Sequence, residues 1–133
     1  MGKVLRNWRL NNGILLEAED ESINYGEYWR IKLVVKGEVE VKEEYLPHVK
    51  EEPLGQEALR ELGERVQYRR ELSRMGVPQG EIARVKEELL SSFEENSLPY
   101  LSNLSFPERF VRKCWREKME EIRKRRLKDE SDI

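Results

Sequence analysis

The chain has 133 residues, of which 38% are hydrophobic and 39% charged, and its 25 Lys or Arg and 27 Asp or Glu give a formal net charge of −2. This length suits one domain with a modest core, and three Trp, five Tyr and three Phe with a near-zero net charge exclude an intrinsically disordered chain. No apolar run reaches the roughly eighteen residues that a membrane-spanning helix needs.

The first third of the chain is predicted to form strands. A strand over residues 4–10 is followed by Asn11-Asn12-Gly13 and then by apolar residues that alternate with polar ones. Asn-Gly between two strand-like segments is the strongest short hairpin signal, because both residues tolerate positive φ. We therefore predict a hairpin with Ile14, Leu16 and Ala18 on one face.

A polar loop over residues 20–27 precedes the third predicted strand. From Tyr28 onward, a series of apolar residues falls on odd numbers and continues past Gly37: Trp29, Ile31, Leu33, Val35, Val39 and Val41. Unbroken parity favours one long strand, residues 28–43, bent at Gly37. A bulged hairpin around Gly37 is the competing interpretation.

Helices are predicted for the rest of the chain, at about residues 56–75, 78–96 and 105–127, before a frayed tail over residues 128–133. Apolar residues in these segments recur at helical spacing. Gly76-Val77-Pro78 is expected to end the first helix and to start the second. Ser105 and Glu108 fit a capping box at the start of the third.

Together these elements predict an α+β fold for residues 1–133 as a single domain. A three-stranded antiparallel sheet, residues 4–43, would be covered by the three C-terminal helices. The long third strand, if it is an edge, carries Lys and Glu that discourage aggregation. It could also pair with its counterpart in a second copy, and we therefore predict a homodimer.

The sequence predicts a cytoplasmic location and offers little for catalysis. A single cysteine, Cys114, allows no intramolecular disulfide, and the N-terminus lacks the apolar run of a secretory signal. The one histidine, His48, lies in a Pro-flanked acidic loop, whereas Cys114 lies on an apolar helix face typical of a small buried side chain. We therefore predict no enzyme, no metal site and no cofactor.

Residues 75–85 resemble the turn of a helix-turn-helix, with Gly76-Val77 at the turn. Arg84 would then be a candidate contact to nucleic acid. The segment departs from that family at Leu72, where a small residue is usual, and the glutamates of the following helix would repel phosphate. An ordinary pair of helices explains the same apolar spacing.

Charge is distributed unevenly along the chain. Residues 17–52 contain eleven Asp or Glu and five Lys or Arg, whereas residues 108–128 contain ten Lys or Arg and four Glu. The basic last helix could contact a phosphate backbone, an acidic protein, or the acidic segment of this chain or of a second copy. Its glutamates can also pair with lysines along the helix, which describes an ordinary solvated face. The candidate binding residues in this helix are Arg112, Arg116, Arg123 and Lys124.

Aromatic residues concentrate in the predicted strands. Trp8 and Trp29 are expected to belong to the core. Tyr28 and Arg30 fall on the outer face of the long strand, and aromatic and Arg side chains are favoured at protein interfaces. We therefore include both of these residues among the candidates for partner binding.

One resemblance covers the front of the chain. The pattern Asn12-Gly13-x-x-Leu16-Glu17-x-x-Asp20-x-Ser22, followed by Tyr28-Trp29-x-x-x-Leu33, is similar to the opening of small uncharacterised bacterial proteins. The resemblance implies a free-standing bacterial domain, and no activity carries over from it.

These features predict a non-catalytic interaction or assembly module of the bacterial cytoplasm. It would act through the strand edge or the basic helix, with itself or another protein as its partner and no membrane. The first alternative is a nucleic-acid-associated regulator, which would show binding that falls steeply with salt. The second is an enzyme that uses carboxylates only and needs two of them facing a pocket.

Overall fold

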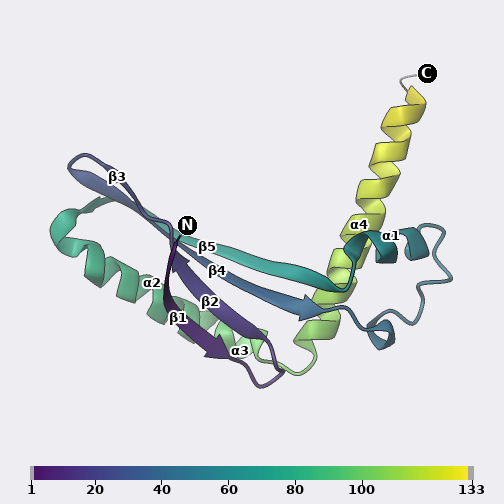
Figure 1. Ribbon diagram of the computed structural model, residues 1–133, viewed down its shortest axis with the longest axis horizontal. Helices are drawn as coiled ribbons and strands as arrows, with labels where there is room; N and C mark the ends of the chain where they lie inside the picture. Colours follow the sequence, from purple (N-terminus) through teal and green to yellow (C-terminus); the bar gives the residue numbers. More distant parts are fainter. Residues whose placement is uncertain (1, 132–133) are drawn as a thin grey trace. The chain divides into compact units, whose positions relative to one another are not determined.

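The computed structural model describes residues 2–131 and shows an α+β protein with an antiparallel sheet, as predicted (Figure 1). The predicted numbers of three strands and three helices are too small, since the described residues form five strands, four α-helices and two 3-10 turns. The chain divides into two compact units. Unit 1 comprises residues 1–38 and 67–104, and unit 2 comprises residues 39–66 and 105–133.

The strands are β1 (Lys3–Arg9), β2 (Leu15–Asp20), β3 (Ile23–Tyr25), β4 (Tyr28–Glu40) and β5 (Arg65–Pro78). The helices are α1 (Gly55–Leu62), α2 (Ile82–Asn96), α3 (Leu98–Leu101) and α4 (Phe106–Ser131), with 3-10 turns η1 (Glu43–Tyr45) and η2 (Gln79–Glu81). Unit 1 contains β1, β2, β3, η2, α2 and α3 with most of β4 and β5. Unit 2 contains η1, α1, α4 and the remaining residues of β4 and β5.

The hairpin predicted at residues 11–13 joins β1 to β2, which pair antiparallel. Leu10 N donates to Ile14 O at 2.9 Å, so Leu10 and Ile14 enclose a three-residue loop. Within the loop, Gly13 N donates to Leu10 O at 3.0 Å. Gly13 has a φ of 90°, whereas Asn12 keeps a negative φ. The prediction relied on both residues, but a three-residue loop needs only its last residue in the left-handed region.

β2, β3 and β4 form one long hairpin. β2 and β3 both pair antiparallel with β4 in the same register and are separated only at residues 21–22. There, Ser22 Oγ accepts a hydrogen bond from Lys32 N at 3.0 Å. The loop predicted over residues 20–27 is therefore wrong in its middle, because it contains β3 and leaves Gly26-Glu27 as the turn. Three strand residues are too few to show alternation in a sequence.

β4 is one continuous strand, as its parity predicted, and the competing hairpin at Gly37 is wrong. It ends at Glu40 instead of residue 43. β2 and β3 occupy one side of β4 and β5 occupies the other, so β4 is not an edge. A homodimer that pairs β4 with its counterpart is therefore incompatible with this topology.

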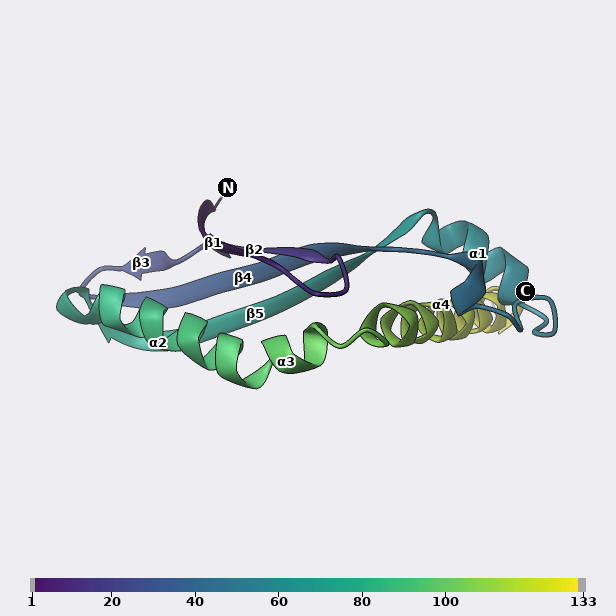
Figure 2. The same ribbon diagram turned by 90° about the horizontal axis from the view of Figure 1, so that it is seen from below.

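The core of unit 1 lies between the sheet and α2, which runs along one face (Figures 1 and 2). Leu16, Leu33 and Val35 of the sheet are almost completely buried, and so is Phe93 of α2. Full burial of such side chains stabilises the fold by about 1.5–3 kcal/mol each. Trp8 packs on Phe93 with ring centroids 5.3 Å apart.

The prediction that both strand tryptophans belong to the core holds only in part. Trp8 and Trp29 are each half-buried. The indole Nε1 of Trp8 donates to Glu94 Oε2 at 2.9 Å, so that one end of the ring remains at the polar margin of α2. Trp29 Nε1 is buried without a hydrogen-bond partner among the residues that the structure describes.

Residues 65–78 form a strand where apolar spacing predicted the second half of a helix over residues 56–75. Helix α1 ends before Gly63, whose φ of 75° is rare for residues with a side chain. Beyond it, Val66 is buried and Tyr68 is half-buried, while Gln67 between them is exposed. The helix prediction was wrong because the few apolar residues of this segment fit the helical period of about 3.6 as well as the strand period of two. The residues between these apolar positions are densely charged, and they do not distinguish a helix from a strand.

The remaining helix predictions are largely confirmed. Residues 78–96 contain η2 and α2, and the short helix α3 follows them. α4 begins at Phe106 and continues to Ser131, so residues 128–131 of the predicted frayed tail are helical, while residues 132–133 lie outside the described part of the chain.

Unit 2 is built on the packing of α1 against α4. Trp115 of α4 is 7% exposed, and its Nε1 donates to Gly55 O of α1 at 2.9 Å. Ala58 of α1 and Val111 and Ile122 of α4 are fully buried. The inward face predicted for the last helix is therefore confirmed. None of the helices within residues 2–131 is both long enough and apolar enough to cross a membrane.

Candidate interaction surface

The structure distributes the seven residues selected from the sequence over three elements. Tyr28 and Arg30 lie on β4 and Arg84 lies on α2, all in unit 1, whereas Arg112, Arg116, Arg123 and Lys124 lie on α4 in unit 2. The seven candidate residues therefore do not form a single binding site. Each group has its own neighbours, which decide whether its charge is available to a partner.

Arg84 is engaged by carboxylates near its own helix start. Its guanidinium donates to Glu81 at 3.0 Å and to Glu88 at 2.5 Å, and Arg74 of β5 pairs with Glu88 at 2.8 Å. The hydrogen bonds that Arg84 donates to Glu88 and Glu81 raise the pKa of Arg84, and those that Glu88 accepts from Arg74 and Arg84 lower the pKa of Glu88. Arg84 is therefore part of a surface ion-pair network.

The resemblance of residues 75–85 to a helix-turn-helix is wrong. Residues 75–78 belong to β5, and η2 leads from this strand into α2. A recognition helix is seated by the helix that precedes it. A strand precedes α2, so Arg84 does not belong to a helix-turn-helix.

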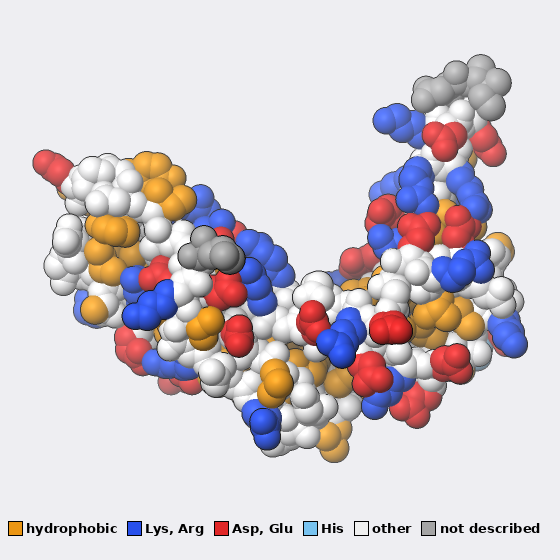
Figure 3. Space-filling view, in the orientation of Figure 1, with side chains coloured by type: hydrophobic (Ala, Val, Ile, Leu, Met, Phe, Trp, Pro, Cys, Tyr) orange, Lys and Arg blue, Asp and Glu red, His pale blue; other side chains and the backbone are white. Residues whose placement is uncertain are grey.

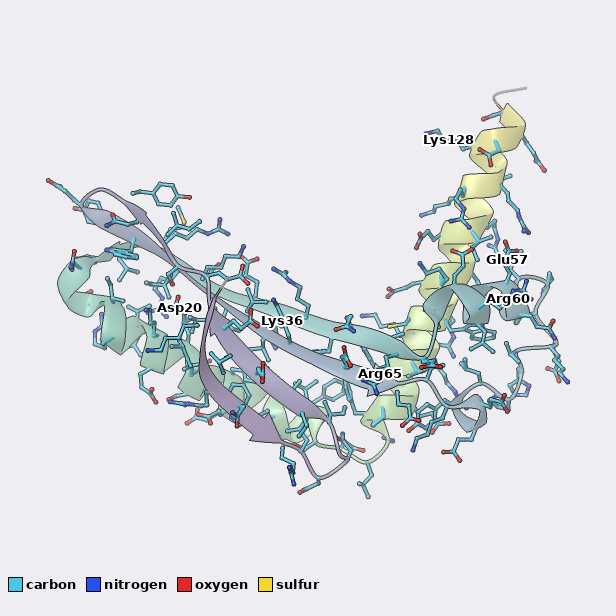
Figure 4. The ribbon with its side chains drawn as sticks, in the orientation of Figure 1. Asp20, Lys36, Glu57, Arg60, Arg65 and Lys128 are labelled. Atoms are coloured by element: carbon cyan, nitrogen blue, oxygen red, sulfur yellow. The ribbon has the colours of Figure 1, made fainter. Side chains whose placement is uncertain are left out.

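The C-terminal arginines of α4 find acidic partners in α1. Arg125 pairs with Glu61 at 2.7 Å, and Arg126 pairs with Glu57. The hydrogen bond from Arg125 lowers the pKa of Glu61. Figure 4 shows Glu57 on α1 in unit 2. These carboxylates lie outside residues 17–52, the acidic segment considered as an internal partner.

The four candidates on α4 differ in the hydrogen bonds and ion pairs that their side chains make. Arg112 Nε donates to a backbone carbonyl of η1 at 2.7 Å. Arg123 pairs with Glu120 at 3.0 Å, so this glutamate pairs with an arginine and not with one of the lysines along the helix. No ion pair or hydrogen bond within residues 2–131 involves the side chains of Arg116 and Lys124. Of the four candidates on α4, Arg116 and Lys124 therefore keep charges that no described residue pairs with.

Arg116 borders an open hollow of about 340 Å³ in unit 2. The hollow is lined by Glu52, Pro53 and Leu54 before α1 and by Arg116, Met119, Glu120 and Arg123 of α4. Two carboxylates face it, which is the arrangement that a carboxylate-only enzyme requires. One of them, Glu120, is already paired with Arg123.

His48 and Cys114 make no hydrogen bond with each other in the described part of the chain. His48 Nδ1 lies 2.9 Å from Glu51 Oε2, and both side chains are exposed. Burial raises the pKa of the Cys114 thiol, and the nearby Glu117 carboxylate raises it further, which disfavours the thiolate. Over residues 2–131 no three His, Cys, Asp or Glu side chains cluster closely enough to hold a metal ion.

β5 forms an edge of the unit 1 sheet opposite β1 (Figure 1). Its residues pair with β4, as the hydrogen bonds Gln67–Glu38 at 3.2 Å and Arg30–Glu71 at 2.8 Å show. No backbone hydrogen bond in the described chain joins residues 67–78 to a segment beyond β4 and η2. The outer side of β5 therefore presents a row of backbone N–H and C=O groups.

The two faces of β5 differ in their neighbours. Arg70 donates to Ser97 Oγ at 2.5 Å next to the end of α2, and Arg74 pairs with Glu88 of α2. The even-numbered residues from Tyr68 to Arg74 therefore face α2. The odd-numbered residues among them, which include Glu71, face away from α2, because side chains alternate along a strand.

Two oppositely charged side chains on this open face, Arg69 and Glu71, have hydrogen-bonding groups that no described residue uses. Arg69 makes no hydrogen bond or ion pair within the described residues. It lies near Lys36, whose pKa is raised first by a hydrogen bond to Glu19, and Arg69 opposes this rise. Glu71 accepts from Arg30 through Oε1 only, so its Oε2 is available to another donor.

Exposed apolar side chains gather at the β3 end of unit 1. Tyr25 is 61% exposed, Tyr28 52% and Met75 67%. Figure 3 shows hydrophobic side chains on the surface over this end. Tyr28 is thus exposed, as predicted. Arg30 beside it is half-buried and paired with Glu71.

Sequence reasoning missed Arg69 and Glu71, because it placed both in a helix. Two signals could have located the strand that carries them. Gly63 is a helix terminator, and Val66 and Tyr68 begin an alternation of apolar and polar residues. The edge position itself depends on which strands pair, and no local pattern contains that information.

Comparison with known proteins assigns no family to this geometry. No family model, no curated protein and no solved structure matches the chain. The resemblance of the opening residues to small bacterial proteins stays a prediction.

Proposed function

We propose that the protein is a non-catalytic interaction module that binds its partner by strand addition along β5. In this mode, an extended segment forms main-chain hydrogen bonds with a sheet edge, and alternate side chains provide selectivity. The partner is a second copy of the chain or an extended segment of another protein. The open outer side of β5 carries this proposal.

The other edge of the same sheet is less suited to strand addition. β1 has 7 residues and contains a register shift between Val4 and Arg6. Bulges of this kind interrupt an edge and disfavour pairing. β5 has 14 residues, and its only proline, Pro78, stands at its end. A partner strand can therefore extend along most of β5.

The charge on β5 favours some partners over others. The strand contains four arginines and one glutamate, Glu71. Charged side chains on an edge discourage indiscriminate pairing with apolar strands. A partner with carboxylates opposite the arginines gains cross-strand ion pairs, so charge can select among partners.

Hydrogen exchange of the β5 amides tests the proposal. In the isolated protein, amides of residues 67–76 that point away from β4 exchange rapidly. Partner binding, or concentration in the case of self-association, slows their exchange, because strand addition gives them acceptors. Light scattering during size-exclusion chromatography, at low and high salt, gives the size of the complex in the same samples.

The opposite outcome is equally clear. Protection confined to α4, together with nucleic acid that co-purifies at low salt and dissociates at high salt, would contradict strand addition. It would favour the nucleic-acid-associated regulator, with Arg116 and Lys124 as the first residues to replace. An absorbance ratio at 260 and 280 nm recorded on the purified protein distinguishes the two cases.

A further inference from the structure

We propose that the strand added to β5 is β5 of a second copy, antiparallel, with the two-fold axis at Arg70. This inference rests on the proposed function, because it names the partner and the register for the same edge. It follows from the order of side chains along residues 67–73 and from the faces to which the structure assigns them.

Antiparallel pairing around a two-fold axis restricts the possible registers. Residues that face each other across two strands lie on the same side of the sheet. In a pair of identical strands they must therefore both be odd-numbered or both be even-numbered, and one residue faces its own copy. With Arg70 at the axis, Arg69 faces Glu71, Tyr68 faces Leu72 and Gln67 faces Ser73, each of them twice.

The open face of this pair gains two ion pairs. Arg69 has no anionic partner among residues 2–131 and lies near the cation Lys36. Glu71 of the second copy brings a carboxylate whose Oε1 accepts from Arg30 and whose Oε2 has no partner among the described residues. One carboxylate can accept from two guanidinium groups. Both copies make this contact, because the symmetry repeats it.

The face that packs on α2 gains apolar contacts. Tyr68 and Leu72 are half-buried in the isolated chain, and pairing places each of them opposite the other. Cross-strand pairs of an aromatic and an aliphatic residue stabilise sheets. Arg70 faces its own copy, but its guanidinium is bonded to Ser97 Oγ and lies 6.0 Å from the Phe93 ring centroid. These contacts draw the two cations away from the axis.

Other registers lack these contacts or shorten the ladder. An axis at Glu71 opposes two glutamates, and like charges directly opposite each other are destabilising. An axis at Leu72 places Arg69 opposite Met75 and Glu71 opposite Ser73, so that register forms no ion pair. An axis at Tyr68 pairs Arg65 with Glu71 but keeps only residues 65–71 in the ladder. An axis at Arg70 keeps residues 65–75, the longest ladder that also contains ion pairs.

A charge-exchange experiment tests this register. Arg69→Glu alone opposes two glutamates across the interface, and Glu71→Arg alone opposes two arginines. Each variant is expected to raise the dimer dissociation constant at least about tenfold, because both symmetric ion pairs become repulsive. An equimolar mixture of the two variants restores opposite charges at every contact, so a heterodimer forms with nearly wild-type affinity. Native mass spectrometry separates the heterodimer from both homodimers by mass.

Two control variants make the same charge changes away from β5. Glu17→Arg alters an exposed residue of β2, inside the sheet, and Arg9→Glu alters an exposed residue of β1, at the other edge. Neither residue makes an ion pair or hydrogen bond in the described structure. Both controls are expected to dimerise like the wild type. Circular dichroism checks that all four variants fold.

The possible failures point to different errors. If Glu71→Arg dissociates the dimer and Arg69→Glu does not, or if the mixture fails to form a heterodimer, the register at Arg70 is overturned while strand addition at β5 stands. If the wild type remains monomeric at high concentration, the second copy is overturned, and amide exchange with another partner still decides the proposed function. If every variant dimerises like the wild type, the dimer uses another surface, and both proposals fail.

Discussion

β5 and α4 are the two arginine-rich elements of this chain, and the fold uses their cations differently. In α4, Arg125 and Arg126 pair with carboxylates of α1. In β5, Arg70 and Arg74 contact the α2 side, whereas Arg69 makes no ion pair in the described structure. Charge density along a sequence therefore does not locate a binding surface. What matters is whether the fold provides each charge with a partner.

The difference has a geometric cause. Glu57 and Glu61 lie one turn apart on α1, and α4 crosses them with two consecutive arginines. A packed pair of helices thus brings opposite charges together on the margin of a shared apolar core. A strand at the edge of a sheet has a neighbour on one side only. Arg69 consequently has no ion-pair partner among residues 2–131.

The largest expected effect tests whether apolar packing, not charge, holds α4. Trp115→Ala removes a side chain that is 7% exposed and leaves Gly55 O without its donor. We expect the free energy of unfolding to fall by about 3–5 kcal/mol, as for other buried aromatic truncations. Urea denaturation measures this change. Trp115→Phe, which keeps most of the ring volume, should lose less, and an equal loss would contradict the packing argument.

A smaller effect is expected where β5 contacts the end of α2. Arg70→Ala removes the hydrogen bond to Ser97 Oγ and leaves that buried hydroxyl without this donor. Such losses amount to about 1–2 kcal/mol of unfolding free energy. Arg74→Ala, on the same face, removes an exposed ion pair and should cost less. Thermal unfolding of both variants makes the comparison, and the reverse order would show that Arg70 is not anchored.

The smallest expected effect is on the pH dependence of stability. It concerns Glu88, which pairs with Arg74 of β5, and Glu61, which pairs with Arg125 of α4. Hydrogen bonds from Arg74 and then Arg84 lower the pKa of Glu88, and the hydrogen bond from Arg125 lowers that of Glu61; the ordinary value of both is 4.5. A depressed folded-state pKa contributes stability that is present above the unfolded value and is lost as pH falls through the folded value.

Stability should therefore decline as pH falls below about 4.5, and the decline should be shallower in Glu88→Gln and in Glu61→Gln than in the wild type. Near pH 7 each variant should melt close to the wild type, because exposed ion pairs contribute little. Chemical denaturation at a series of pH values measures the slopes. Slopes identical to that of the wild type in both variants would contradict the depressed pKa values.

Local sequence patterns determined much of this protein. The α+β class, the hairpin at residues 11–13, the continuity of β4 and the apolar face of α4 all follow from patterns within a few turns or one strand. Such patterns are readable because side-chain burial imposes a period of two in strands and about 3.6 in helices. Local patterns also selected Arg112 and Tyr28 as candidate binding residues. In the structure Arg112 donates a hydrogen bond to a backbone carbonyl, whereas Tyr28 is exposed.

Only the tertiary structure decided which strand is an edge and which charges remain without partners. β5 was assigned to a helix because its apolar residues are few and its arginines suit a solvated helix face as well as an edge strand. The sheet order then made β4 internal and gave Arg69 and Glu71 an open face. These facts depend on contacts between residues far apart in the chain, and local propensity does not encode them.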